Sequence, residues 1–224
     1  MNRKLLLSLS VLMLVCGTSF GALLNVNNPS FEGQVQADGT TTKFVNALSW
    51  TKTATETRVW MRNPLSSDVL QPTNGANMAY VTFNGSLYQT ILPIAENTRY
   101  TLTIDLAAAT NNPDTGAALT TSIAFGEIGL YANGFNPTSL LTNQRFGKTN
   151  PDDTNTEIFT DHFETFSISW DSTASSKIGQ TLWITITTGQ VWVDNVRLDA
   201  TVIPEPASMM LLTFGGLMIL KKKR

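Results

Sequence analysis

Residues 100–106 read Tyr-Thr-Leu-Thr-Ile-Asp-Leu, and residues 181–187 read Thr-Leu-Trp-Ile-Thr-Ile-Thr. In both stretches apolar side chains alternate with polar ones, most of which are threonine. Successive side chains of a β-strand point to opposite faces, so each stretch has one apolar face and one polar face. This pattern is typical of antiparallel sheets that pack one face against a core. We therefore expect both stretches to be strands of a β-sandwich.

The same alternation recurs along the chain, and turn-forming residues separate the stretches. Clusters of Asn, Asp, Pro and Gly, such as residues 111–116 and 133–137, mark the expected turns. No part of residues 22–203 shows sustained helical periodicity. The sequence thus predicts one all-β domain there, an antiparallel, jelly-roll-like β-sandwich. Further strands are expected at residues 79–83, 87–92, 128–131 and 163–170.

Composition and charge exclude several classes of function. The chain has 224 residues, of which 42% are hydrophobic and 14% charged, and its formal net charge is −2. The hydrophobic share is close to that of globular proteins, so the chain can bury a core. The charge leaves no basic surface for a nucleic acid. A single Cys and a single His argue against a zinc site with several ligands and against a Cys/His catalytic pair.

The N-terminus has the pattern of a secretory signal peptide. A basic start precedes the apolar run of residues 5–16, and small residues precede a cleavage position before Ala22. Residues 1–21 are therefore expected to form a signal helix, to direct export and to be removed by signal peptidase. Removal would also take away Cys16, the only cysteine.

Residues 204–224 form a tail with three parts. Pro204, Glu205 and Pro206 stop the last strand, a short apolar segment follows, and the chain ends on four basic residues. Apolar residues followed by a basic cluster predict a short transmembrane helix whose end stays cytoplasmic.

This tail resembles the PEP-CTERM sorting signal of Gram-negative bacteria. The resemblance implies that an exosortase recognises Pro204, Glu205 and Pro206 and cleaves nearby. It also implies an inner-membrane-anchored intermediate, followed by release to the cell surface or the extracellular matrix. A simple C-terminal membrane anchor is the alternative.

The two ends of the expected domain resemble carbohydrate-binding-module-like, or galactose-binding-like, jelly rolls. The motifs are Asn-Asn-Pro-Ser-Phe-Glu-Gly at residues 27–33 and Val-Trp-Val-Asp-Asn-Val-Arg-Leu at residues 191–198. The apolar parity slips by one residue at Asp194 and Asn195, which predicts a β-bulge. The resemblance implies a structural Ca²⁺ held by Glu32 and Asp194, and oxygen ligands suit that ion. In the alternative reading, Asp194 caps a turn and Glu32 is a surface carboxylate.

Aromatic side chains are the candidates for a ligand platform, because their rings bury a large area and keep a polar edge. Trp183 opposes Leu182 and Ile184 on its expected strand, which places it on the threonine-rich face. Tyr88 and Trp192 are the further ligand-binding candidates.

Catalysis finds little support in the sequence. The only histidine, His162, lies between Asp161 and Glu164 in the chain, but successive strand residues point to opposite faces, and there is no Gly-x-Ser-x-Gly motif. We therefore predict that the protein is not an enzyme.

The function expected from these patterns is non-catalytic. It is adhesion to, or structuring of, extracellular polysaccharide in a biofilm by an exported protein. A purely structural surface protein without glycan specificity is the alternative, and a carbohydrate-active hydrolase with paired carboxylates is a weaker one.

Overall fold

The computed structural model describes residues 21–33, 36–43, 49–52, 59–81, 85–113, 116–119, 124–147 and 158–204. Strands dominate this part of the chain, with one short 3-10 helix. The elements are β1 (Ala22–Leu24), β2 (Thr41–Lys43), β3 (Thr51–Lys52), β4 (Val59–Arg62), β5 (Met78–Val81), β6 (Gly85–Pro93), β7 (Thr98–Ala108), β8 (Phe125–Ala132), η2 (Pro137–Ser139), β9 (Leu140–Gly147), β10 (Glu164–Asp171), β11 (Thr181–Gly189) and β12 (Val191–Val202).

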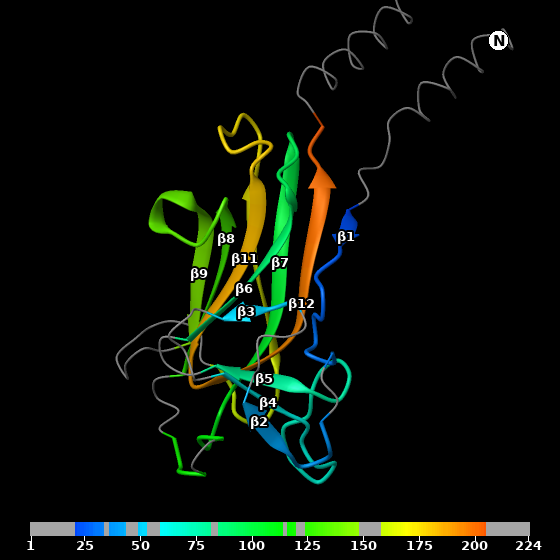
Figure 1. Cartoon of the computed structure of the whole chain (residues 1–224), viewed down its shortest axis with the longest axis vertical. Helices are drawn as coiled ribbons and strands as arrows, with labels where there is room; N and C mark the ends of the chain where they lie inside the picture. The colour runs from blue at the N-terminus through cyan, green and yellow to red at the C-terminus, as the bar shows by residue number, and fades with distance from the viewer. Residues whose placement is uncertain are drawn as a thin grey trace, which may run out of the picture.

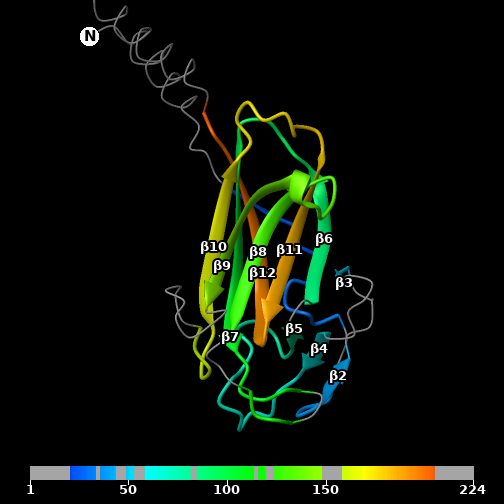
Figure 2. The same ribbon diagram turned by 90° about the vertical axis from the view of Figure 1, so that its left-hand side faces the viewer.

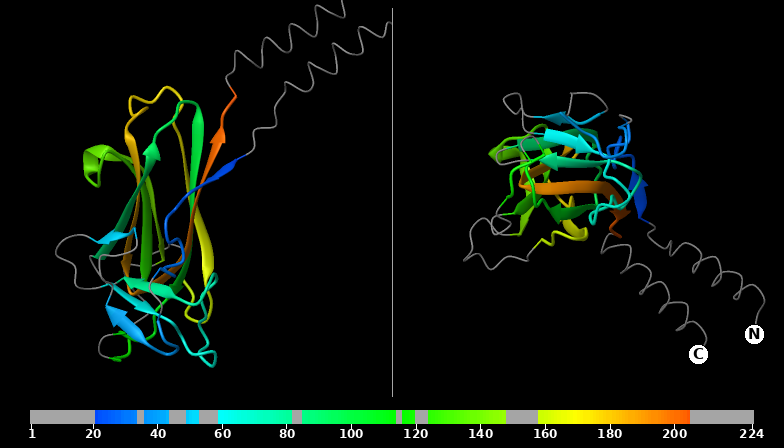
Figure 3. Two further views of the ribbon diagram at one scale, coloured as in Figure 1. Left: turned by 45° about the vertical axis from the view of Figure 1, so that its right-hand side comes forward. Right: turned by 90° about the horizontal axis from the view of Figure 1, so that it is seen from below.

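The strands form two antiparallel sheets, which confirms the predicted all-β sandwich (Figures 1 and 2). Sheet A has the order β10-β7-β12-β5-β4-β2, and β1 pairs with the outer half of β12 (Figure 3). Sheet B has the order β3-β6-β11-β8-β9. The short strands β2, β4 and β5 lie together at the lower end of the molecule in Figure 1.

Both terminal predictions fall outside this description. The signal segment up to residue 20 and the tail from Glu205 onward are not among the described residues. Within the described ranges, no helix is long and apolar enough to cross a membrane. Signal-peptide cleavage, exosortase sorting and the membrane-anchored intermediate therefore stay predictions.

The core lies between the two sheets and follows the predicted alternation. The inward leucines and isoleucines of β7 and β11 have exposed fractions of 0%. They meet the inward apolar residues of β8, β10 and β12 in one cluster. Because apolar burial is the main stabilising term, this alternation suffices to define the sandwich.

The predicted bulge in β12 is confirmed. Pairing with β7 shifts register between Asp194 and Arg197, and Asn195 has a φ of 51°. Asp194 faces outward by the same alternation that places Trp192 on the outer face of sheet A, and the extra residue that follows it returns Val196 and Leu198 to the core. The Asp194 carboxyl group therefore lies directly before the bulge, opposite Asp105 of β7.

Substitution of Asn195 tests the importance of this backbone conformation. The left-handed region disfavours residues with a Cβ, more so for alanine than for asparagine. Asn195→Gly should therefore be more stable than Asn195→Ala by roughly 1 kcal/mol, although both lose the same side-chain hydrogen bonds. Urea unfolding of the two variants measures the difference. An alanine variant as stable as the glycine variant would contradict a left-handed bulge.

Candidate functional site

Three aromatic rings form a row on the outer face of sheet A. Trp60 of β4 is opposite Tyr80 of β5, which is in turn opposite Trp192 of β12. The ring centroids are 5.8 Å apart for Trp60 and Tyr80, and 5.0 Å apart for Tyr80 and Trp192. Beyond Trp192 the paired residue of β7 is Ala107, whose side chain is small. We call these three rings the aromatic row.

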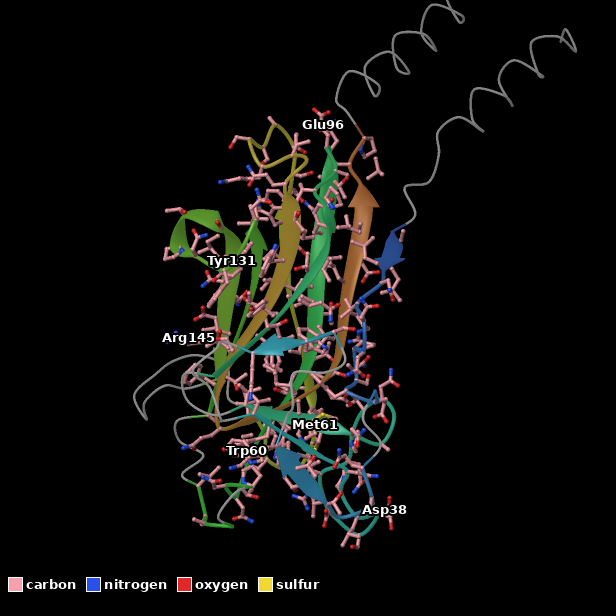
Figure 4. The ribbon with its side chains drawn as sticks, in the orientation of Figure 1. Asp38, Trp60, Met61, Glu96, Tyr131 and Arg145 are labelled. Atoms are coloured by element: carbon pink, nitrogen blue, oxygen red, sulfur yellow. The ribbon has the colours of Figure 1, made fainter. Side chains whose placement is uncertain are left out.

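The aromatic row is buried although it points away from the sandwich core. Trp60 is 6% exposed, and its neighbour Met61 lies in the core with an exposed fraction of 0% (Figure 4). Burial of the Tyr80 ring raises the pKa of its hydroxyl to about 12. Strands β4 and β5 are therefore covered on both faces.

Part of the cover is residues 63–77, the connection from β4 to β5, which we call the covering segment. Its Leu70 packs against the cluster that contains the aromatic row, as do Leu119 and Phe163 from other parts of the chain. Between the segment and sheet A lies a pocket of about 400 Å³. A volume of this order is typical of sites for small molecules. The lining residues are Arg62, Asp68, Val69, Leu70, Met78, Ala108, Thr110, Asn111, Thr160, Asp161 and Trp192.

Asp194 lies on the same face as Trp192, two residues further along β12. Its exposed fraction is 0%. Oδ2 accepts hydrogen bonds from the N–H groups of Thr73, at 2.7 Å, and Asn74, at 2.9 Å, and Oδ1 accepts one from the N–H of Asn195 at 2.7 Å. Burial raises the pKa of the Asp194 carboxyl to about 6, while these N–H groups oppose the rise. Asp194 is thus a buried acid that holds its proton to unusually high pH.

A second carboxyl group lies beside Asp194. The Thr73 hydroxyl is 2.7 Å from Oδ2 of Asp105 and 3.0 Å from Oδ2 of Asp194. One hydroxyl carries one hydrogen and donates to only one of the two carboxyls, so a proton on Asp194 would complete the second bond. Asp105 also accepts hydrogen bonds from Thr165 and from Arg197. The covering segment therefore links the two acids.

Glu32, the other candidate metal ligand, accepts hydrogen bonds from the C-terminal end of the covering segment. Its Oε1 accepts hydrogen bonds from the N–H groups of Ala76, at 2.7 Å, and Asn77, at 2.6 Å. A Cβ at Gly75 would collide with the Glu32 carboxylate. The carboxylates of Glu32 and Asp194 thus bind different peptides of one turn. In the described part of the chain, no three acidic, His or Cys side chains gather as metal ligands.

The predicted ligand platform is split between the two sheets. Trp183 and Tyr88 lie on sheet B and stack with ring centroids 5.3 Å apart. Trp192 belongs to the aromatic row of sheet A. The only histidine, His162, is exposed and bonds its neighbour Asp161 at 2.7 Å. The structure therefore brings Trp192 and Asp194 together, and it leaves Trp183 and Tyr88 elsewhere.

Sequence reasoning missed Tyr80, Arg62 and Asp105 as site residues, and it gave Trp60 only as a weaker candidate for the ligand platform. One signal was available, because all four residues of β5, Met78–Val81, are apolar, which is unusual for a strand with one solvent face.

Comparison with known proteins identifies the family of the chain. The family model HpiC1-like, described as HpiC1 cyclase, matches residues 22–199. A Stig cyclase from Fischerella sp. TAU, solved with (3Z)-3-(1-methyl-2-pyrrolidinylidene)-3H-indole, is 22% identical, with a TM-score of 0.66 over 83% of this chain and 100% of that chain. A cyclase from Fischerella sp. TAU, solved with 4-(1H-indol-3-yl)butan-2-one, is 22% identical, with a TM-score of 0.65 over 82% of this chain and 100% of that chain. No curated protein matches.

Carbohydrate-binding modules also occur among the similar structures, at low identity. TmCBM61, solved with β-1,4-galactotriose, is 11% identical, with a TM-score of 0.46 over 79% of this chain and 98% of that chain.

The comparisons overturn the predicted function. The expectation of a non-enzyme that adheres to biofilm polysaccharide is wrong, because the matched family is one of cyclases. The motifs at the two ends of the domain indicated the fold correctly, and the error was to extend them to glycan binding. From Ala22 to Asp199, the chain belongs to the HpiC1-like cyclase family.

Proposed function

We propose that the protein catalyses the cyclisation of a small, mostly apolar aromatic substrate in the pocket beneath the covering segment, with Asp194 as the acid. The observation that carries this proposal is the buried Asp194 carboxyl, whose pKa is raised to about 6, beside the aromatic row. Asp194 does not itself line the pocket, but it lies on the same face as Trp192, which does. A buried acid with a perturbed pKa near a pocket is a typical arrangement for general acid catalysis.

The substrate class is inferred from the rings and from the relatives. Two cyclases from Fischerella were solved with indole-containing compounds. Here Trp192 lines the pocket with the small part of its ring that is exposed, and Met78 and Leu70 add apolar surface. We therefore propose a substrate with a planar ring system the size of indole and an attached unsaturated chain.

The reaction that these residues support is an acid-catalysed isomerisation. Asp194 transfers its proton to an unsaturated carbon of the substrate, and a cation forms. A π bond of the same molecule attacks that cation and closes the ring, and loss of a proton to the Asp194 carboxylate regenerates the acid. The product therefore has the same mass as the substrate.

The surroundings of Asp194 suit both of its protonation states. Burial favours the protonated acid before the reaction, and the N–H groups of Thr73, Asn74 and Asn195 stabilise the carboxylate after it has donated. The electron-rich faces of Tyr80 and Trp192 stabilise a nearby cation. Thr73 and Asn74 cover Asp194. We therefore propose that the covering segment opens before the proton is transferred.

Calcium enters the proposal as a structural ion at Glu32. Its carboxylate is exposed, and among the described residues Oε2 accepts one long hydrogen bond, from Asn77 Nδ2 at 3.4 Å. An oxygen donor of this kind is chemically suited to Ca²⁺. Both carboxylate oxygens of Asp194 accept hydrogen bonds from backbone N–H groups, so we assign Asp194 to catalysis and not to calcium binding. An ion at Glu32 would stabilise the end of the covering segment.

Replacement of the acid tests the reaction. Asp194→Asn keeps the size and polarity of the side chain but removes its transferable proton, so cyclisation should fall about 100-fold or more. Activity of the wild type should also decline as the pH rises above about 6, because the acid form is then lost. The assay incubates the protein with a panel of 3-alkenylindoles and detects isomers of unchanged mass by chromatography.

Asp171→Asn is the matched control for this variant. Asp171 is partly exposed and pairs with Arg99 at the distant end of β10. Its replacement should leave the rate unchanged. An Asp194→Asn variant that remains as active as the wild type would rule out Asp194 as the acid.

Calcium binding is tested by thermal unfolding, which does not depend on activity. Addition of Ca²⁺ should raise the melting temperature by several degrees over that in chelator, because a ligand that binds only the folded state stabilises it. Glu32→Gln keeps an oxygen for the two N–H groups but loses the charge, and it should lose most of the calcium effect. Glu96→Gln, at the opposite end of the molecule (Figure 4), should keep it. Identical melting of the wild type with and without calcium would refute the site.

A further inference from the structure

Arg62 is the one basic side chain that lines the pocket. It ends β4 and belongs to the same outer face as Trp60, two residues earlier. Its Cζ lies 6.0 Å from the centroid of the Trp192 ring. The guanidinium group therefore lies over the Trp192 ring, and a substrate in the pocket would contact both side chains.

The guanidinium makes few of the hydrogen bonds that it can offer. Nη2 donates to Oδ2 of Asp68 at 2.6 Å, which is its only hydrogen bond within the described residues. Nε is buried and has no partner. A guanidinium has five N–H donors, and buried donors without partners are rare in folded proteins. About one third of the side chain is exposed. The group therefore has donor capacity left for a molecule in the pocket.

The negative charges around the pocket favour a neutral hydrogen-bond acceptor on the ligand over a charged one. Arg62 already pairs with Asp68, and the exposed Asp161 adds a second negative charge to the lining. A carboxylate on the ligand would meet both negative charges at close range. A neutral acceptor, such as a carbonyl oxygen, would accept from Arg62 without that repulsion.

We propose that Arg62 determines specificity by donating a hydrogen bond to a neutral acceptor on the substrate, such as a carbonyl oxygen, while the aromatic ring of the substrate contacts Trp192. This inference rests on the proposed substrate pocket. It adds that the substrate carries a polar acceptor beside its ring, and that Arg62 fixes which end of the molecule faces Asp194.

Two probes of similar shape test this inference. They are 4-(1H-indol-3-yl)butan-2-one, which has a carbonyl oxygen, and 3-butylindole, which lacks it. Calorimetric titration of the wild-type protein should show roughly tenfold tighter binding of the ketone, as expected for one hydrogen bond to a charged group. In Arg62→Met, the ketone should weaken to the affinity of 3-butylindole. The affinity for 3-butylindole should stay the same, which shows that the variant keeps its pocket.

Arg99→Met serves as the matched control. Arg99 also pairs with an aspartate, Asp171, but it lies on the exposed distant part of β7. This variant should keep the tenfold preference. If the wild type binds both probes equally, the role of Arg62 is overturned and the pocket stands. If it binds neither probe, the proposed pocket fails as well.

Discussion

Asp194 is a carboxyl group with no exposure to solvent, and much of the molecule is arranged around it. A buried carboxylate is costly unless it is protonated or accepts several hydrogen bonds. Three backbone N–H groups point at Asp194, two of them from the covering segment. The segment folds back over sheet A and thereby encloses both the acid and the aromatic row. Hydrogen bonds to this one buried acid thus connect the bulge in β12 with the segment that covers the pocket.

The two sheets of the sandwich differ in what their outer faces carry. On sheet B, the outer face shows a partly exposed aromatic pair, Trp183 and Tyr88, and the exposed ion pair of Arg145 with Glu127 (Figure 4). On sheet A, the outer face carries the buried aromatic row and the two linked acids, Asp105 and Asp194. Because sheet A is the one that carries a second apolar cluster beneath a cover in the described part of the chain, we place the candidate chemistry there.

The sequence predicted the sandwich because inward apolar residues occur at every second position in β7 and β11. This alternation indicates which residues face the core. It predicted the bulge because the parity of Val193 and Val196 requires an extra residue. The same reasoning failed for Trp60 and Tyr80, since it assigns one face to the core and the other to solvent. Strand β5 is buried on both faces. That residues 63–77 fold over its outer face is visible in the structure and not in the sequence pattern.

Function was harder to predict than fold for a physical reason. An acid whose pKa is raised by burial needs no histidine, no serine motif and no fixed spacing, so a sequence search for catalytic patterns passes over it. Asp194 was singled out, but as a metal ligand, because its position in the closing motif was known and its burial was not. The covering segment, which buries Asp194, comes from residues more than a hundred positions earlier in the chain.

Direct titration of Asp194 tests the account most sharply. Carbon-13 NMR of the aspartate side-chain carboxyl carbons, with Asp194→Asn to assign the signal, measures the pKa of this group in the folded protein. We predict a value of about 6. A value at or below 3.8, the ordinary value of the group, would show that burial adds nothing to the proton affinity of Asp194, and it would contradict the role of Asp194 as the acid.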